Sequence, residues 1–231
     1  MVNLLAYGLA AALTCQQALA VPTNKYYNPK TNYPTCKNRK SQVANFDDLQ
    51  GIPGNLLNPI PSGYQGLLYQ GFSFSTVIAT GTGLQPGVAP HSGTNYAAAN
   101  LVTQLQGTPT ITTFFPGSQT KSFDLESFYF GCATMLGQGA AAIPAACNIQ
   151  VTGYQGSDNS VSNAKQICSR QFQYNPTTAL GTVEQAFSGK INGCKDLSFA
   201  IVTFSPPGGL AVTSPLLAVV LDDIKYSTCS K

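Results

Sequence analysis

Two acidic pairs lie near opposite ends of the chain, and their carboxylates are the side chains best suited to bind a cation. The pairs are Asp47–Asp48 in "NFDDL" and Asp222–Asp223 in "VLDDI", and they hold four of the nine acidic residues. Neighbouring side chains on a β-strand point to opposite faces, so one carboxylate of each pair would face a shared site. Like charges that face each other across strands are destabilising. Calcium, which takes carboxylate and carbonyl oxygens, would compensate this repulsion.

The loop "SGTNYAAAN" at residues 92–100 offers one more oxygen ligand, Asn95. We therefore predict a calcium ion that stabilises the fold and takes no part in chemistry. Its predicted ligands are Asp47, Asp48, Asp222, Asp223 and Asn95. The alternative is that each aspartate caps a turn, accepts backbone N–H groups or faces water.

Four tyrosines in or near glycine-rich turns are candidate ligand-binding residues: Tyr64, Tyr69, Tyr96 and Tyr154. Tyrosine offers a ring face for a sugar and a hydroxyl group for hydrogen bonding. Asn, Gln and Ser residues, which suit sugar hydroxyls, surround them. The pattern indicates glycan binding, and the alternative is that the rings pack at the ends of the fold.

The groups that enzymes need are sparse in this sequence. His91 is the sole histidine and lies beside Pro90, and no GxSxG motif is present, which argues against a serine hydrolase. Asp124 and Glu126 in "FDLES" would lie on one face of a strand, roughly 7 Å apart, a spacing that a glycosidase tolerates. The same pattern is typical of a solvent-facing strand. We predict that the protein is not an enzyme, with a glycoside hydrolase as the weakest alternative.

The elements that would position these residues are short β-strands. Runs rich in Val, Ile, Phe, Tyr and Thr occur at residues 71–79, 108–115, 122–130, 147–155, 197–205 and 216–226. Several alternate polar and apolar residues, Gly, Pro, Ser and Thr separate them, and no stretch has a helical period. The pattern predicts an all-β protein, an antiparallel β-sandwich of the jelly-roll type. In such folds the first and last strands are commonly neighbours.

The start of the chain and the cysteines indicate an extracellular protein. Residues 1–20 have an apolar run and end in Ala-Leu-Ala, which predicts a signal peptide. We expect a basic, Tyr- and Pro-rich arm at residues 21–44 and the sandwich at 45–231. Cys15 leaves with the signal peptide, and six cysteines allow fifteen pairings. We predict that three disulfides cross-link the sandwich: Cys36–Cys229, Cys132–Cys147 and Cys168–Cys194.

Charge and hydropathy narrow the possible partners. Charged residues make up 9% of the chain and the net charge is +3, too little for a nucleic-acid-binding protein. No second apolar stretch approaches the length of a membrane span. With one histidine and no CxxC motif, zinc binding is disfavoured. We expect a soluble, secreted monomer without membrane insertion.

The chain resembles a group of secreted fungal proteins with a jelly-roll-like domain. The resemblance rests on "FDDL" (46–49), "IPSGYQGLLYQGFSF" (60–74), "FDLESFYFGC" (123–132), "CNIQVTGY" (147–154) and "LLAVVLDDIKY" (216–226). It implies an architecture similar to carbohydrate-binding modules that hold a structural calcium between the first and last strands. It also implies that some members are candidate effectors of plant-associated fungi. Related sequences often have tryptophan near Tyr69, whereas this chain has none, which weakens the expectation of tight glycan binding.

Three functions follow from these observations. The first is a non-catalytic protein that recognises a polysaccharide or another cell-surface component, of a fungal or plant wall. The second is an effector that binds a host protein or triggers host defence. The third and weakest is a hydrolase with an unrecognised site. A row of exposed tyrosines on one concave face would favour the first function, and an exposed apolar patch with no groove would favour the second. A deep cleft that holds Asp124 and Glu126 would favour the third.

Overall fold

A computed structural model describes the chain at residues 36, 38–52, 58–77, 79–80, 83–84, 87–100, 103, 107–135, 142–178, 181–208 and 217–231. The predicted signal peptide and residues 21–35 of the predicted arm lie outside these residues. One compact unit, Cys36–Lys231, contains the whole described part. Among the described residues, no helix is both long enough and apolar enough to cross a membrane.

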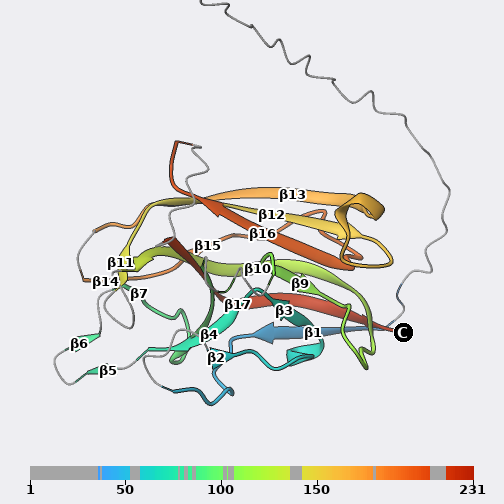
Figure 1. Cartoon of the computed structure of the whole chain (residues 1–231), viewed down its shortest axis with the longest axis horizontal. Helices are drawn as coiled ribbons and strands as arrows, with labels where there is room; N and C mark the ends of the chain where they lie inside the picture. The colour runs from blue at the N-terminus through green and yellow to red at the C-terminus, as the bar shows by residue number, and fades with distance from the viewer. Residues whose placement is uncertain are drawn as a thin grey trace, which may run out of the picture. The chain divides into compact units, whose positions relative to one another are not determined.

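The larger of two main sheets has eight strands and is built around the last strand of the chain (Figure 1). Its central path consists of β11 (Ala142–Pro144), β10 (Thr120–Met135), β17 (Leu217–Ser230), β8 (Asn95–Ala99), β4 (Ser73–Thr76) and β2 (Asn58–Pro59). Two further strands join this path at its sides: β1 (Arg39–Ala44) pairs with β17, and β15 (Ala186–Phe187) pairs with β10.

The second sheet has five strands, and short elements complete the fold. It consists of β13 (Lys165–Tyr174), β12 (Cys147–Gln155), β16 (Phe199–Ser205), β9 (Thr110–Thr112) and β3 (Leu68–Gln70). The remaining elements are the pairs β14 (Thr182–Val183) with β7 (Gly87–Val88) and β5 (Ala79–Thr80) with β6 (Gly83–Leu84), and the 3₁₀ turns η1 (Tyr64–Gly66) and η2 (Val161–Asn163). All strand pairs of the two main sheets are antiparallel, which confirms the predicted all-β sandwich.

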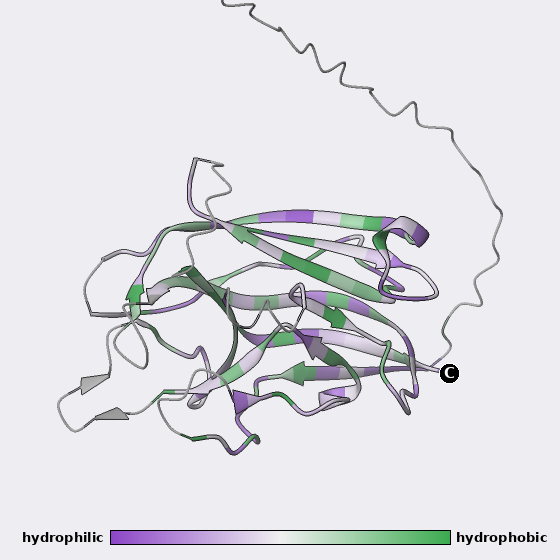
Figure 2. Cartoon of the chain, viewed as in Figure 1, coloured by the Kyte–Doolittle hydropathy of each residue, from purple (hydrophilic) through white to green (hydrophobic). Residues whose placement is uncertain are grey.

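The core lies between the two layers and follows from the alternation in the strands. On β12, Ile149 and Val151 are buried, whereas Asn148 and Gln150 on the opposite face are only half-buried. Figure 2 shows hydrophobic and hydrophilic residues interchanging along the strands of both layers. The ring of Phe128 on β10 lies 5.1 Å from that of Phe172 on β13, so aromatic side chains from both sheets meet in this core.

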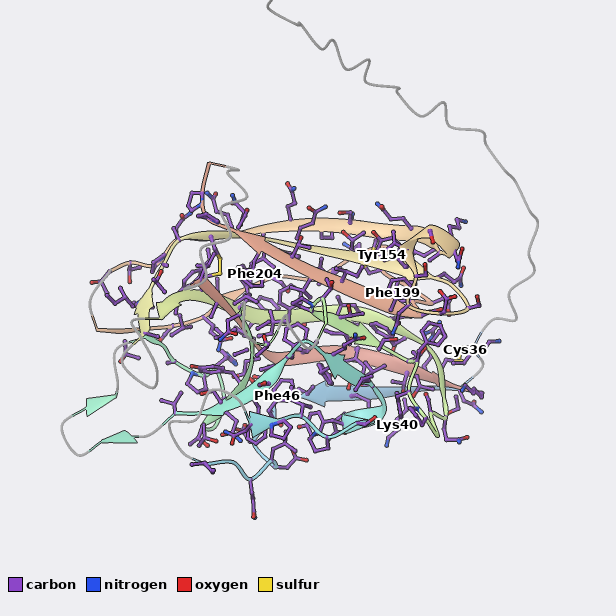
Figure 3. All side chains as sticks on the ribbon, viewed as in Figure 1. Cys36, Lys40, Phe46, Tyr154, Phe199 and Phe204 are labelled. Carbon is purple, nitrogen blue, oxygen red and sulfur yellow. A yellow bond between two sulfur atoms is a disulfide. The ribbon has the colours of Figure 1, made fainter. Side chains whose placement is uncertain are left out.

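The three predicted disulfides, Cys36–Cys229, Cys132–Cys147 and Cys168–Cys194, are present. The predicted proximity of the first and last strands is also confirmed. β1 is antiparallel to β17, with Arg39 opposite Cys229 and Ala44 opposite Ile224. Figure 3 shows Cys36 beside the end of the chain.

Two details of the predicted N-terminal region are wrong. Arg39–Ala44 lies within the predicted arm but forms β1, because the edge of β17 between Ile224 and Cys229 provides hydrogen-bonding partners for it. The alternation expected for the acidic pairs requires "FDDL" to lie on a strand, but this segment forms a turn, in which the Leu49 N–H donates to the Phe46 carbonyl at 3.1 Å. Phe46 starts this turn in the left-handed region, with φ of 63°.

Candidate functional site

Residues 91–95 bring one carboxylate of each acidic pair to the same short segment. Asp47 Oδ1 accepts the backbone N–H groups of Thr94 at 2.9 Å and Asn95 at 3.0 Å. Asp222 Oδ2 accepts those of His91 at 2.7 Å and Ser92 at 3.2 Å. The two pairs therefore meet, as predicted, and they meet around backbone donors of the chain itself.

Asp223 reaches this segment as well, so the expectation that only one of Asp222 and Asp223 would face the site is wrong. Its Oδ2 lies 2.7 Å from His91 Nδ1, and its Oδ1 accepts the Ser92 hydroxyl at 3.0 Å. Asp223 has φ of 43°, and the register of β17 against β10 shifts in this region. This irregularity breaks the alternation of the strand and turns both carboxylates toward one loop.

The other two predicted calcium ligands have different roles. Asp48 is exposed, and its Oδ1 accepts the Tyr64 hydroxyl at 2.6 Å. Asn95 is buried, and its Nδ2 donates to the carbonyls of Phe46 at 2.7 Å and Leu49 at 3.0 Å. The side chain of Asn95 thus closes the FDDL turn through its amide donor.

The repulsion for which we predicted calcium is offset by donors of the chain. The carboxylates of Asp47, Asp222 and Asp223 accept N–H and O–H groups from residues 91–95. Among the described residues, no group of three or more His, Cys, Asp or Glu side chains has the arrangement of a metal site. An ion would have to use the remaining lone pairs of these oxygens. Calcium binding stays a prediction.

Asp222 is fully buried, which makes the cluster sensitive to pH. Burial raises the pKa of its carboxyl from 3.8 to about 7, and the Asp223 carboxylate adds to the increase, whereas the N–H donors of Ser92, Asp223 and His91 oppose it. Between these two pKa values the folded chain binds more protons at Asp222 than the unfolded chain does. The free energy of unfolding contributed by Asp222 therefore falls as the pH rises from about 4 to about 7.

We expect the melting temperature of the wild-type protein to decline across this pH window more steeply than that of an Asp222→Asn variant. The measurement is a series of thermal melts of both proteins between about pH 4 and about pH 8. The difference between the two curves isolates the contribution of Asp222, because the variant differs from the wild type only at this residue. Parallel curves would show that Asp222 does not titrate in this range.

Three of the four predicted ligand-binding tyrosines are in the core. Tyr64, Tyr69 and Tyr96 are only 7%, 3% and 8% exposed, so their ring faces are not available to a sugar. Their burial is tolerated because hydroxyl groups find partners: that of Tyr69 donates to the Tyr226 hydroxyl at 3.3 Å. Tyr154 differs, because its ring is partly exposed on β12.

A row of three aromatic rings, which no sequence pattern predicts, extends from the acidic cluster to the surface. The rings of His91 and Tyr129 stack with centroids 3.3 Å apart, and Tyr129 lies 4.9 Å from Phe187. β15 places Phe187 opposite Tyr129 on β10, and Phe187 is 54% exposed. The only sequence signal was an isolated aromatic residue in "QAFSGK", outside every predicted strand.

Phe187 stands at the rim of a surface hollow of about 580 Å³. Polar and charged side chains line the hollow beside it: Asp124, Glu126, Lys190, Asn192 and Lys195. The hollow therefore combines one exposed ring with hydrogen-bond donors and acceptors, which are the two kinds of contact that a hydroxyl-rich ligand with an apolar face can use.

The two candidate glycosidase carboxylates, Asp124 and Glu126, share this hollow but differ in environment. Asp124 Oδ1 lies 2.8 Å from Arg39 Nη1 and accepts the Asp196 N–H at 2.7 Å. Arg39 also contacts Asp196 Oδ1 at 2.7 Å, so Asp124 belongs to an ion-pair network that joins β1 to the loop before β16. Glu126 is exposed.

Comparisons with known proteins do not assign the chain to a family. No family model matches it, and no curated protein matches it. The crystal structure of a DUF4465 family protein from Bacteroides caccae ATCC 43185 aligns with 88% of this chain and 97% of its own length, at 12% identity and a TM-score of 0.44. At this level the similarity carries no argument about function.

Proposed function

We propose that this is a secreted, non-catalytic β-sandwich protein that binds a glycan of a cell wall or cell surface in the hollow beside Phe187. The observation that carries the proposal is the exposed ring of Phe187, which contacts the ring of Tyr129, itself stacked on His91. A ring fixed in this way presents a flat apolar surface, and the C–H face of a sugar packs against such a surface at little cost in conformational entropy.

The polar lining suits a ligand with many hydroxyl groups and no net charge. The lining carries two carboxylates, Asp124 and Glu126, and two ammonium groups, Lys190 and Lys195, so its formal charges cancel, and Asn192 supplies both a donor and an acceptor. A strongly anionic or cationic ligand would meet two like charges in this lining, whereas sugar hydroxyls form hydrogen bonds to groups of either sign.

Location outside the cell is part of this proposal. Three disulfides persist in oxidising compartments and are rare in the cytosol, and they agree with the signal peptide that the sequence predicts. The resemblance to secreted fungal proteins points to a fungal or plant wall as the source of the glycan.

One observation favours a glycoside hydrolase as the second candidate, because Asp124 and Glu126 lie in the same hollow as Phe187. The role of Asp124 in the Arg39 network argues for a structural function of that carboxylate. An effector that binds a host protein stays a prediction. Release of soluble sugar from a bound polymer would establish the hydrolase.

Replacing Phe187 with alanine is expected to reduce retention on the cognate polymer about tenfold, which corresponds to about 1.4 kcal/mol of binding free energy. The measurement is a pull-down on insoluble chitin, β-glucan, cellulose and xylan. Val161→Ala is the matched control, because Val161 is also a large exposed apolar residue, 47% exposed, and lies on η2.

Equal retention of the Phe187→Ala variant and the wild type would rule out the hollow as the site. If the wild-type protein binds none of the polymers, the glycan proposal fails and a host protein becomes the partner to seek. The same pull-down and a thermal melt, each run in calcium and in EDTA, test the predicted ion. Loss of retention or of melting temperature in EDTA would support calcium at the acidic cluster.

A further inference from the structure

The outer face of the five-stranded sheet carries a regular array of uncharged polar side chains. The outward residues of β12 stand opposite those of β13 and β16 in three aligned rows. The rows are Gln173, Asn148 and Ser205; Gln171, Gln150 and Thr203; and Ser169, Thr152 and Ile201. Neighbouring side chains are about 4.8 Å apart between strands and about 6.7 Å apart along each strand.

The array differs from an ordinary solvated face in the absence of charge. Eight of its nine side chains are amides or hydroxyls, the ninth is Ile201, and none is ionised. The opposite face of the same strands is core, with Ile149 and Val202 buried. Solubility alone is usually served by Lys and Glu at such positions.

Part of the array is held in place, and part is open to a ligand. Gln150 Nε2 donates to Ser169 Oγ at 2.9 Å, and Ser169 Oγ lies 3.3 Å from Thr152 Oγ1. The side chains of Asn148, Gln171, Gln173, Thr203 and Ser205 make no hydrogen bond within the described part of the chain. Five array residues line a shallow hollow of about 250 Å³: Asn148, Gln150, Gln171, Thr203 and Ser205.

An aromatic side chain continues the array at one end. Tyr154 follows Thr152 on the same face of β12, and its ring stacks on Phe199 with centroids 5.0 Å apart and planes 14° apart (Figure 3). Tyr154 is the one predicted ligand-binding tyrosine that stays partly exposed. A ring fixed next to amide and hydroxyl groups provides both contacts that a sugar chain uses.

We infer that this face is a second, separate binding surface, on which an uncharged polysaccharide lies flat across β13, β12 and β16. The absence of charge favours an uncharged polymer, because the array offers hydrogen bonds but no ionic partner to an acidic or basic polymer. The inference rests on the proposed function only for the class of ligand, because the two surfaces share no residue and lie on different sheets. Two sites on one protein raise the avidity for a polymer above that of either site.

The test is the pull-down on insoluble chitin, β-glucan, cellulose and xylan with Thr203→Arg, Phe187→Ala and the double variant. Arginine at the exposed position 203 covers the shallow hollow with a long charged side chain. Thr177→Arg, at another exposed threonine, is the matched control. Thermal melts verify that the arginine variants are folded, and Gln171→Arg, at the same hollow, replaces Thr203→Arg if that variant melts lower than the control.

We expect each single variant to lose about tenfold in retention and the double variant to lose about a hundredfold or more, as independent sites require. If Thr203→Arg binds as well as Thr177→Arg, or if Phe187→Ala alone abolishes retention, the second surface is overturned. Loss in Thr203→Arg with full retention in Phe187→Ala would support this surface and refute the hollow beside Phe187. Absence of binding by the wild-type protein would refute both.

Discussion

Replacing both Cys36 and Cys229 with alanine is expected to lower the free energy of unfolding by roughly 5 kcal/mol. The bridge joins residues 193 apart in sequence and so removes more entropy from the unfolded chain than a short loop does. It also holds β1, which pairs with β17 over its whole length. Denaturant unfolding of the variant and the wild type, followed by circular dichroism, measures the difference.

The matched control is removal of Cys132 and Cys147, whose sequence separation is only 15. The chain-entropy model assigns this loop about 3 kcal/mol, so the long bridge should contribute more. A smaller loss on removing Cys36–Cys229 than on removing Cys132–Cys147 would contradict the entropic account. It would mean that local packing around the buried Cys132 and Cys147 decides the outcome.

Removing the Cys36–Cys229 bridge should also make the protein sensitive to protease at β1. Without the bridge, β1 is held at one edge by the ladder to β17 and by the contacts of Arg39 with Asp124 and Asp196. Strand β1 contains Arg39 and Lys40, so its opening should expose a trypsin site first. In the wild-type protein, a cut after Lys40 leaves the N-terminal fragment attached through Cys36.

The fold class was predictable because alternation of polar and apolar residues is a local property of each strand. On β12, Asn148 to Val151 show it without interruption, and the structure has the predicted sandwich there. The cysteine count predicted disulfides, and the proximity of the first and last strands supported Cys36–Cys229, whereas nothing in the sequence derived Cys132–Cys147 and Cys168–Cys194 from among the fifteen possible pairings. The turn at "FDDL" was missed because its apolar Phe46 is buried, as in a strand, while its backbone is left-handed.

The ligand-binding residues were harder to predict, because burial of a tyrosine depends on contacts between distant parts of the chain. Tyr64 is buried since its hydroxyl donates to Asp48 and accepts the Phe46 N–H at 3.0 Å, contacts that the glycine-rich sequence around it does not indicate. The row of rings formed by His91, Tyr129 and Phe187 depends on the register of β10 against β15 and on the hydrogen bond between His91 and Asp223. No local pattern contains that information.

Asp47, Asp222 and Asp223 are thus best explained as anchors of residues 91–95, and Gly93 gives the sharpest test of this role. Gly93 has φ of 51°, and a Cβ atom added there would lie within 2.1 to 2.3 Å of the Asp47 carboxylate. Replacing Gly93 with alanine is expected to cost about 4 kcal/mol. The left-handed backbone accounts for about 1–2 kcal/mol, and displacement of a carboxylate that accepts two N–H groups accounts for the rest.

The explanation requires that Gly93 and Asp47 be coupled. In an Asp47→Ala background the clash is absent, so Gly93→Ala should cost only the backbone strain of about 1–2 kcal/mol. Gly117→Ala is the matched control, because Gly117 has φ of 79° and nothing within 4 Å of an added Cβ. The Gly117→Ala replacement should cost only that backbone strain, and the cost should be the same with or without Asp47.

Denaturant unfolding of the variants completes a double-mutant cycle with an expected coupling of about 2 kcal/mol between Gly93 and Asp47. Additive costs would mean that the added methyl group does not act through Asp47, which would contradict the role of this carboxylate as an anchor of residues 91–95.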